Sequence, residues 1–204
     1  MKFFISSVKK LSPLSYAEQS KVVLSLTRIA KLCYTNRMIR CILFDRDGTL
    51  GELDDKRFPQ TFTPFADIKK TFDEIKSKGF FVGIISNQAS IARGTGTHYD
   101  FEKEFSSYGV DAWAICPHDN ADDCDCRKPK SGLLLTVAKQ LNVQPQECLV
   151  VGDRTSDIVC ALNVGAQAVL VLTGYGEKEK DEALRLYPAL PIIPRFDKIT
   201  DILT

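Results

Sequence analysis

The sequence predicts an α/β protein built on a doubly wound parallel sheet of the Rossmann-like type, with an N-terminal helical extension. Three observations support this fold class. From about residue 39 onward, short apolar runs alternate with segments of helical periodicity, which indicates strands and helices in turn. The apolar runs are continuous, as in strands that helices cover on both faces. Groups of polar residues follow several runs, where ligands bind in such sheets.

An amphipathic helix is expected near the N-terminus, over about 15–34. Ser15 and Glu18 have the spacing of a capping box, and apolar residues recur behind them at helical intervals. We therefore expect an N-terminal helical extension over 1–37 and one α/β domain over 38–204. The apolar stripe of this helix needs a covering surface, on the domain or on a second copy, because an isolated helix of that length is marginal in water.

The alternation then predicts the elements of the domain in order. The apolar run CILF at 41–44 predicts a buried strand, and the periodic segment 65–78 predicts a helix. The run FFVGII at 80–85 predicts a second strand, and aromatic residues at helical spacing predict a helix over 99–108. The same two patterns predict a strand at 112–116, a helix at 131–141, a strand at 148–151, a helix at 156–163, a strand at 168–172 and a helix at 177–186.

Composition excludes several classes of protein. The 204 residues are 44% hydrophobic and 26% charged, as in an ordinary globular protein. The net charge is +1, which supplies no global field toward nucleic acid or an anionic membrane. No apolar run approaches the roughly 20 residues of a membrane span, and the first apolar run is too short for a secretory signal. We expect a cytoplasmic monomer or homodimer that binds neither nucleic acid nor membranes.

Polar residues at the strand ends predict phosphoryl chemistry. Asp45, Asp47 and Asp153 would converge at one edge of the sheet, where their mutual repulsion calls for a cation, and oxygen ligands favour Mg²⁺. A carboxylate beside Mg²⁺ can attack phosphorus. A bend at Gly48 would let Asp47 face the leaving group as acid and then water as base. Of the remaining polar residues, we expect Ser86 and Asn87 to bind phosphate oxygens and Lys128 to neutralise charge.

A second cluster predicts a structural zinc site. Cys116, His118, Cys124 and Cys126 lie in one short stretch and would supply the four ligands of a tetrahedral Zn²⁺. Four protein ligands leave no open position for water or substrate, so such a site does not catalyse the reaction. The chain has seven cysteines, and the others are expected to be reduced core residues: Cys33, Cys41, Cys148 and Cys160.

The order of these motifs resembles the haloacid dehalogenase superfamily of phosphatases. The matching runs are DRDGTL at 45–50, SNQ at 86–88, Lys128 and GD at 152–153. The resemblance implies that Asp45 is the nucleophile, that Asp47 is the general acid and base, and that Mg²⁺ binds to Asp45, the Asp47 carbonyl and Asp153. Lys128 takes the role of the motif lysine, with Lys130 as a rival. Asp157 is either a carboxylate near the metal or an additional ligand.

The zinc loop is similar to that of two phosphatase groups within this superfamily. The runs CPH at 116–118 and CDCRKP at 124–129 resemble histidinol-phosphate phosphatases and heptose 1,7-bisphosphate phosphatases. The short loop between His118 and Cys124 favours the first group, whereas the runs SNQASIARG at 86–94 and LTGYG at 172–176 favour the second. Ala89 and Ser90 depart from the heptose pattern. The resemblance implies a magnesium-dependent phosphatase of carbohydrate metabolism that acts through an aspartyl-phosphate on a sugar bisphosphate, with histidinol phosphate as the alternative substrate.

Both groups have a minimal cap, and no inserted domain separates the motifs here. The site is therefore expected to be open, with Arg93 and Arg127 at its rim to contact a second phosphate or other substrate oxygens. Two further interpretations stay open. One is a polynucleotide 3′-phosphatase, which the neutral net charge does not support. The other is an interaction module that zinc holds together and that has no catalytic activity. The presence of both Asp45 and Asp47 weighs against it.

Overall fold

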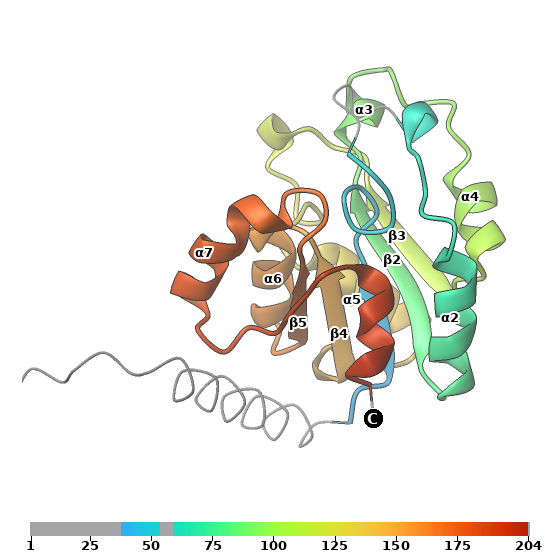
Figure 1. Cartoon of the computed structure of the whole chain (residues 1–204). Coiled ribbons are helices and arrows are strands. Elements are labelled where there is room, and N and C mark those ends of the chain that lie inside the picture. Colours follow the sequence, from blue (N-terminus) through green and yellow to red (C-terminus); the bar gives the residue numbers. More distant parts are fainter. Residues whose placement is uncertain (1–37, 54–58, 204) are drawn as a thin grey trace, which may run out of the picture. The chain divides into compact units, whose positions relative to one another are not determined.

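A computed structural model describes residues 38–53 and 59–203 of the chain. Its central sheet has six parallel strands in the order β3-β2-β1-β4-β5-β6 (Figure 1). The strands are β1 (Cys41–Phe44), β2 (Phe81–Asn87), β3 (Ala112–Cys116), β4 (Cys148–Gly152), β5 (Gln167–Val171) and β6 (Ile192–Ile193). The predicted doubly wound parallel sheet is thereby confirmed. The helix predicted over 15–34, the proposed boundary at residue 37 and Cys33 lie outside the described residues.

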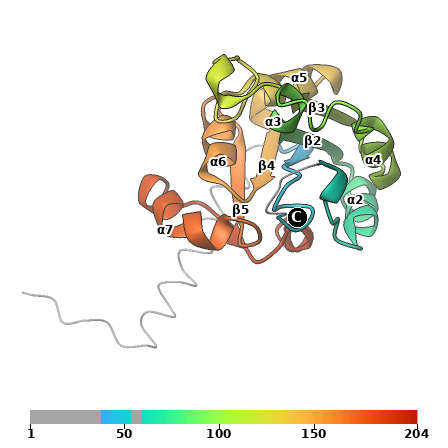
Figure 2. The same ribbon diagram turned by 90° about the horizontal axis from the view of Figure 1, so that it is seen from above.

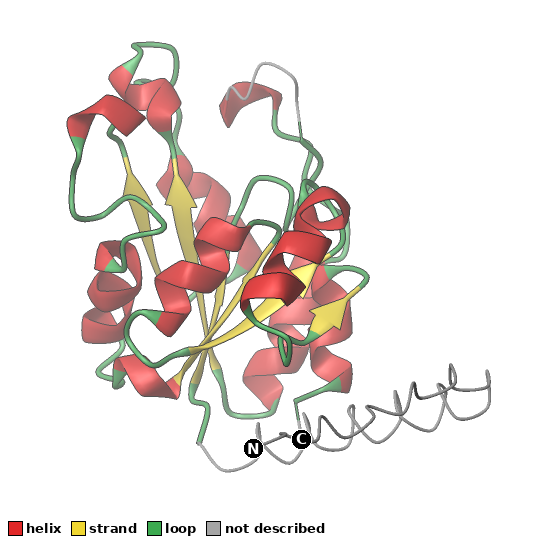
Figure 3. Cartoon of the chain, turned by 90° about the vertical axis from the view of Figure 1, so that its left-hand side faces the viewer, coloured by secondary structure: helices red, strands yellow, loops and turns green. Residues whose placement is uncertain are grey.

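Helices lie on both sides of this sheet (Figures 2 and 3). They are α2 (Ile68–Ser77), α3 (Ala89–Ala92), α4 (Phe101–Tyr108), α5 (Gly132–Gln140), α6 (Thr155–Leu162) and α7 (Gly176–Leu186). The described residues also form four short 3₁₀ helices: η1 (Pro59–Thr61), η2 (Asn120–Asp122), η3 (Pro145–Glu147) and η4 (Phe196–Asp201). Among the helices of the described ranges, none has both the length and the apolar character that a bilayer span requires.

The two faces of the sheet form two apolar layers, because successive side chains of a strand point to opposite sides. On β1, Leu43 belongs to the buried cluster that includes Leu134 of α5 and Ile158 of α6. Phe44 faces the other layer, where its ring lies 4.9 Å from that of Phe72 on α2 and 6.3 Å from that of Phe196 in η4. Burial on both faces explains why the strands appear as continuous apolar runs in the sequence.

The order of the strands reverses between β1 and β4, which are neighbours at the centre of the sheet. The chain proceeds from β1 through β2 to β3 on one side, and from β4 through β5 to β6 on the other. In doubly wound sheets this reversal opens a crevice beyond the carboxyl ends of the strands, and ligands bind there. Asp45 follows β1 and Asp153 follows β4, so both predicted metal ligands lie beside the crevice.

Candidate active site

Asp45 and Lys128 form a buried ion pair at the centre of the site. The Asp45 amide donates to the carbonyl of Val151 at the end of β4 (2.9 Å), which fixes the backbone between the two central strands. Lys128 Nζ lies 2.6 Å from Asp45 Oδ1 and 2.7 Å from Asp157 Oδ1. Burial alone would lower the pKa of Lys128, but the negative charges of Asp157 and Asp45 outweigh it and raise the pKa above its ordinary value. The lysine is therefore a fixed cation against the predicted nucleophile.

Three buried carboxylates converge beside this lysine. Asp45, Asp153 and Asp157 offer oxygens that lie within 4.8 Å of one another. Burial, followed by the charge of Asp45, raises the pKa of Asp153 to about 8. Burial also raises the pKa of Asp157 to about 6, against the lowering effect of Lys128. If all three carboxylates were ionised, the cluster would hold more negative charge than one lysine balances, and a divalent cation would relieve this repulsion.

One carboxylate oxygen in this cluster has no protein partner. Asp153 Oδ2 accepts a hydrogen bond from the Tyr175 amide (2.8 Å), whereas Asp153 Oδ1 is buried and has no hydrogen-bond partner within the described residues. A buried oxygen without a partner is costly unless an ion or water binds it. The donor set consists of oxygens alone, which suits Mg²⁺. The residues therefore fit the predicted magnesium ion.

Two glycines bring the loops after β1 and β5 close to Asp153. Gly48 has φ +87° and Gly174 has φ +59°, in the region that favours glycine. A Cβ at Gly48 would lie 2.3 Å from Asp153 Oδ2, and one at Gly174 would lie 2.1 Å from the same oxygen. Both positions thus require glycine for conformation and for space. The predicted bend at Gly48 is present and turns the backbone directly after Asp47.

Asp47 is held at both carboxylate oxygens. Its Oδ1 accepts from Arg46 Nη1 at 2.8 Å, and its Oδ2 accepts from Gln88 Nε2 at 2.6 Å. Ser86 Oγ lies 3.5 Å from Oδ2 and accepts from Gln88 Nε2 at 2.8 Å. The side chain of Asp47 is 35% exposed, unlike that of Asp45 at 9%. The two aspartates of the motif therefore differ in environment, one buried against a lysine and the other open on one side.

Asn87 lies against the backbone of Lys128. Its Nδ2 donates to the Lys128 carbonyl and its Oδ1 accepts from the Lys128 amide, both at 3.0 Å. This reciprocal pair fixes the backbone that carries the buried lysine. Asn87 was expected as a phosphate ligand, and its contact with Lys128 was not predicted, since the two residues are 41 positions apart.

The structure separates the two rival lysines. Lys128 is 5% exposed and contacts Asp45. Lys130 is exposed, and its Nζ lies 2.8 Å from Asp123 and 3.5 Å from Asp125. Lys128 therefore lies in the site, and Lys130 belongs to the surface of the neighbouring loop. Asp157, which was left open, contacts Lys128 and also accepts from the Arg154 amide at the start of α6 (3.1 Å).

The four predicted zinc ligands come together at the end of β3. Cys116 Sγ lies 3.5 Å from Cys124 Sγ and 3.6 Å from His118 Nδ1. Cys126 Sγ lies 3.2 Å from His118 Nδ1 and 3.4 Å from Cys124 Sγ. The ligand atoms of a tetrahedral zinc ion would be about 3.5–3.8 Å apart, given Zn–S of about 2.3 Å and Zn–N of about 2.0–2.1 Å. The cluster therefore has the composition and nearly the dimensions of a closed zinc site.

Arg93 and Arg127 both lie against the zinc loop. Arg93 forms two hydrogen bonds with Asp119, at 2.6 and 2.8 Å. Arg127 donates to the Asn120 side chain at 2.6 Å and to the His118 carbonyl at 3.1 Å. The loop thus sets the positions of both predicted rim arginines.

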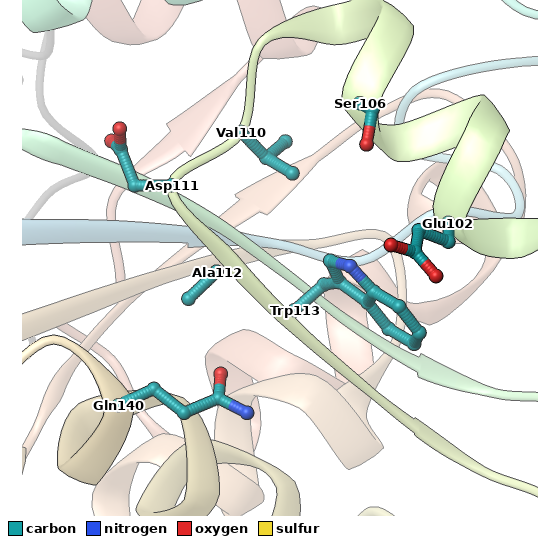
Figure 4. A pocket seen from close by; sticks show the side chains of 7 residues that line it. All are labelled: Glu102, Ser106, Val110, Asp111, Ala112, Trp113 and Gln140. Carbon is teal, nitrogen blue, oxygen red and sulfur yellow. The ribbon is translucent and has the colours of Figure 1, made fainter.

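A shallow depression lies at the opposite end of β3 (Figure 4). The residues that line this depression are Glu102, Ser106, Val110, Asp111, Ala112, Trp113 and Gln140. It contains none of the predicted site residues. The predicted site is at the carboxyl edge of the sheet, whereas this depression includes Asp111 and Ala112, at the amino end of β3.

Comparisons with known proteins indicate the family of this chain. The family model described as HAD-hydrolase-like matches residues 125–199. A D-glycero-beta-D-manno-heptose-1,7-bisphosphate 7-phosphatase of Haemophilus ducreyi is 31% identical over 76% of this chain and 97% of its own. The enzyme of the same name from Haemophilus influenzae is 32% identical over 79% of this chain and 100% of its own.

A solved structure shows the same fold. The D,D-heptose 1.7-bisphosphate phosphatase of B. bronchiseptica, complexed with magnesium and phosphate, superposes with a TM-score of 0.71 at 24% identity. The match covers 80% of this chain and 97% of that protein. With the sequence relatives and the parallel sheet, this match shows that the chain belongs to the haloacid dehalogenase-like hydrolases and is a phosphatase of that family.

Proposed function

We propose that this phosphatase removes one phosphate from a small sugar bisphosphate of the D-glycero-beta-D-manno-heptose 1,7-bisphosphate type. The observation that carries the chemistry is the buried carboxylate of Asp45, which lies 2.6 Å from Lys128 Nζ beside the partnerless oxygen of Asp153. The names of the relatives support the substrate class. The resemblance of residues 86–94 and 172–176 to the heptose enzymes supports it as well.

The residues Asp45, Asp153 and the backbone carbonyl of Asp47 would hold Mg²⁺. When bound there, the ion would neutralise negative charge on the transferring phosphoryl group. Asp157 lies close enough to share the cluster, but both of its oxygens have partners: Oδ1 lies 2.7 Å from Lys128 Nζ, and Oδ2 accepts from the Arg154 amide at 3.1 Å. We therefore assign Asp157 the role of holding Lys128 in place.

The chain's own residues then divide the reaction into two steps. The Asp45 carboxylate forms a bond to phosphorus while the ester P–O bond breaks, and Asp47 gives its proton to the departing alcohol oxygen. Asp47 next takes a proton from water, whose oxygen attacks phosphorus while the bond to Asp45 breaks. Inorganic phosphate leaves and both aspartates return to their starting states. Lys128 and Ser86 stabilise the phosphoryl oxygens.

Arg93 and Arg127 are proposed to contact the part of the substrate that does not react. Both guanidinium groups are fixed against the loop that carries the zinc ligands. A planar guanidinium binds phosphate through two parallel hydrogen bonds. The zinc loop would then contribute to substrate choice through these arginines, without taking part in the chemical step.

Histidinol phosphate is a second candidate substrate. The zinc loop between His118 and Cys124 is as short as in the histidinol-phosphate enzymes that the sequence resembles. The single phosphate of histidinol phosphate is the one that reacts, so this substrate would bring no second phosphate to the two rim arginines.

Turnover with Mg²⁺ tests the proposal. We expect phosphate release from heptose 1,7-bisphosphate to exceed that from the monophosphates and from histidinol phosphate in kcat/KM, with Asp45→Asn as the inactive control. A preference for histidinol phosphate would refute the proposed substrate class. Equal activity of Asp45→Asn and the unaltered protein would refute the proposed site.

A further inference from the structure

Arg46, between the two aspartates of the motif, is a fully buried cation. Its side chain is 0% exposed, and it donates from all three guanidinium nitrogens. Nε and Nη2 each lie 2.9 Å from one carboxylate oxygen of Glu104, and Nη1 lies 2.8 Å from Asp47 Oδ1. Burial alone would lower the pKa of Arg46, but its hydrogen bond to Glu104 and the charge of Asp47 raise it above the ordinary value. The buried guanidinium therefore stays charged.

Aromatic rings hold the guanidinium plane. The carbon at its centre lies 3.7 Å from the centroid of the Phe62 ring and 5.5 Å from that of Tyr99. Nη2 also donates to the Pro59 carbonyl at 3.2 Å. A guanidinium that is stacked on a ring and donates from all three nitrogens has little freedom to rotate. Arg46 thus joins the loop after β1 to the segment around η1 and to α4.

Glu104 is the anchor of this arrangement. It lies on α4, its side chain is 8% exposed, and it accepts from two nitrogens of Arg46. Tyr108, one turn later, donates its hydroxyl to Glu104 Oε1 at 3.1 Å. Each oxygen of the carboxylate therefore has a fixed partner. The Glu104 side chain orients the fork of Arg46 so that Nη1 points at Asp47.

Asp47 is consequently held between two donors on different segments. Arg46 fixes Oδ1 and Gln88 fixes Oδ2, so rotation of the carboxylate would break one contact or both. An acid or base must lie within hydrogen-bond reach of the atom whose proton it exchanges. A displacement of about 1 Å can cost a reaction about 10²-fold.

We propose that Arg46, oriented by Glu104, is a positioning residue that aims the Asp47 carboxylate at the leaving oxygen. The inference rests on the proposed acid role of Asp47. It explains why a charged side chain lies in the loop between the two aspartates, at a cost in desolvation that an apolar residue would avoid. A purely structural ion pair would involve only Arg46 and Glu104. Here the third guanidinium nitrogen, Nη1, donates to Asp47, the proposed acid.

The test compares kcat/KM for two substrates with different leaving groups. A sugar phosphate releases an alcohol that needs a proton, whereas 4-nitrophenyl phosphate releases a stable phenolate that does not. The ratio of the two kcat/KM values therefore measures how well Asp47 delivers its proton. A loss of folded protein lowers both values together and leaves the ratio unchanged.

Three variants are measured against the unaltered enzyme: Arg46→Lys, Glu104→Gln and Asp47→Asn. We expect the ratio to fall by about 10²-fold or more in Asp47→Asn, by about 10²-fold in Arg46→Lys, and by about 10-fold to 10²-fold in Glu104→Gln. Lysine keeps the charge but loses the fork, and glutamine keeps the shape but loses the charge. If Arg46→Lys does not fold, Glu104→Gln decides, because its amide oxygen still accepts from one Arg46 nitrogen.

Arg195→Lys is the matched control. Arg195 also pairs with two carboxylates, those of Asp67 and Asp197, and lies near the rings of Phe65 and Phe196. Within the described part of the chain, its ion pairs involve no residue of the candidate site. We expect this variant to leave the ratio unchanged.

The outcomes separate the two proposals. A ratio that falls in Asp47→Asn but stays constant in Arg46→Lys and Glu104→Gln would overturn the positioning role and leave the proposed function intact. A constant ratio in Asp47→Asn would refute the acid role of Asp47, and the positioning role with it. An equal fall in Arg195→Lys would show that the effect is not specific to Arg46, and would also overturn the inference.

Discussion

Burial and charge act in opposite directions on the individual residues of this site. Asp45, Asp153 and Asp157 are all buried, so removal from water disfavours their charged forms. Lys128 contacts Asp45 and Asp157 and lowers their pKa values, but burial outweighs it and both pKa values stay raised. Asp153 lacks such a contact, and the pKa of this carboxyl is raised to about 8 by burial and by the charge of Asp45. Burial thus raises the pKa of both carboxyls proposed to bind the metal, Asp45 and Asp153.

This imbalance predicts that Mg²⁺ binding depends on pH. Because burial and the charge of Asp45 raise the pKa of Asp153 to about 8, we expect the cation-free protein to hold this proton at neutral pH and to release it when Mg²⁺ binds. Without the cation, the neutral Asp153 carboxyl stabilises the folded state. This contribution to stability is complete at pH values below the pKa of an aspartate in the unfolded chain, and it is lost as the pH rises through about 8. We therefore expect Mg²⁺ to raise the Tm more at pH 9 than at pH 6, as measured by thermal unfolding. An equal shift at both values would contradict the assignment of Asp153.

The glycines around Asp153 give a second prediction. In Gly174→Ala, a Cβ would be placed 2.1 Å from Asp153 Oδ2, in addition to the strain of a positive φ. Gly79 also has a positive φ (+89°) but nothing within 4 Å of an added Cβ, so Gly79→Ala is the matched control. We expect both variants to lose about 1–3 kcal/mol of stability from backbone strain, and Gly174→Ala alone to lose its response to Mg²⁺ in thermal unfolding. Equal responses in the two variants would argue against a metal site at Asp153.

Among the site residues, the sequence predicted those that belong to a short local motif. Asp45, Asp47, Asp153, Ser86 and Lys128 follow strands or a loop with recognisable spacing, and the structure places them at one edge of the sheet. The contacts of Arg46 and Gln88 with Asp47 were not predicted. Arg46 meets its anchor 58 residues away, and Gln88 meets Asp47 from 41 residues away. Such pairings depend on how the segments pack, which no local spacing encodes.

At the scale of elements, the length of the apolar run decided what the sequence could predict. The strands β1, β3, β4 and β5 were predicted to within one residue at either end. Each contains a continuous run of four or five apolar residues that begins and ends clearly in the sequence. The strand β6 has two residues and the helix α3 has four, too few for any periodicity to show. The 3₁₀ helix η4 was missed for the same reason. These short elements form where tertiary packing holds them.

The zinc loop is the element with the clearest experimental signature. It carries four ligands, and it leads directly into Arg127 and Lys128. Because metal binding is coupled to loop folding, we expect Cys124→Ser to lose zinc, to lower the Tm and to reduce turnover by displacing these two residues. Cys160→Ala, in a buried cysteine of α6, serves as the control and should lower the Tm while it retains one zinc per chain. Elemental analysis that finds no zinc in the unaltered, fully active protein would contradict this account.

On the scale of the whole molecule, the catalytic edge is assembled from segments far apart in the chain. The loops after β1, β2, β4 and β5 all meet at the point where the strand order reverses. The parallel sheet explains this convergence, since every strand ends at the same edge. The fold class could therefore be predicted from the sequence together with the location of the site, whereas the contacts within the site could not.

Truncation tests the proposed division of the chain. We expect a protein that starts at Met38 to differ from the full chain in solution size or to have a lower Tm, because the apolar stripe predicted over 15–34 needs a covering surface. Size-exclusion chromatography with light scattering and thermal unfolding measure the two quantities. If neither changes and activity is retained, the N-terminal segment is dispensable and the expected docking is wrong.

The most direct test of the whole account is to trap the proposed covalent intermediate on Asp45. Rapid quenching with phosphorus-labelled substrate should leave acid-stable label on the unaltered protein and none on Asp45→Asn. Asp47→Asn should still take label from an aryl phosphate and should turn over alkyl substrates about 10²–10⁴-fold more slowly. Mapping the label by peptide digestion should place it on the peptide that contains Asp45. Label on Asp45→Asn, or no label on any active protein, would contradict the mechanism.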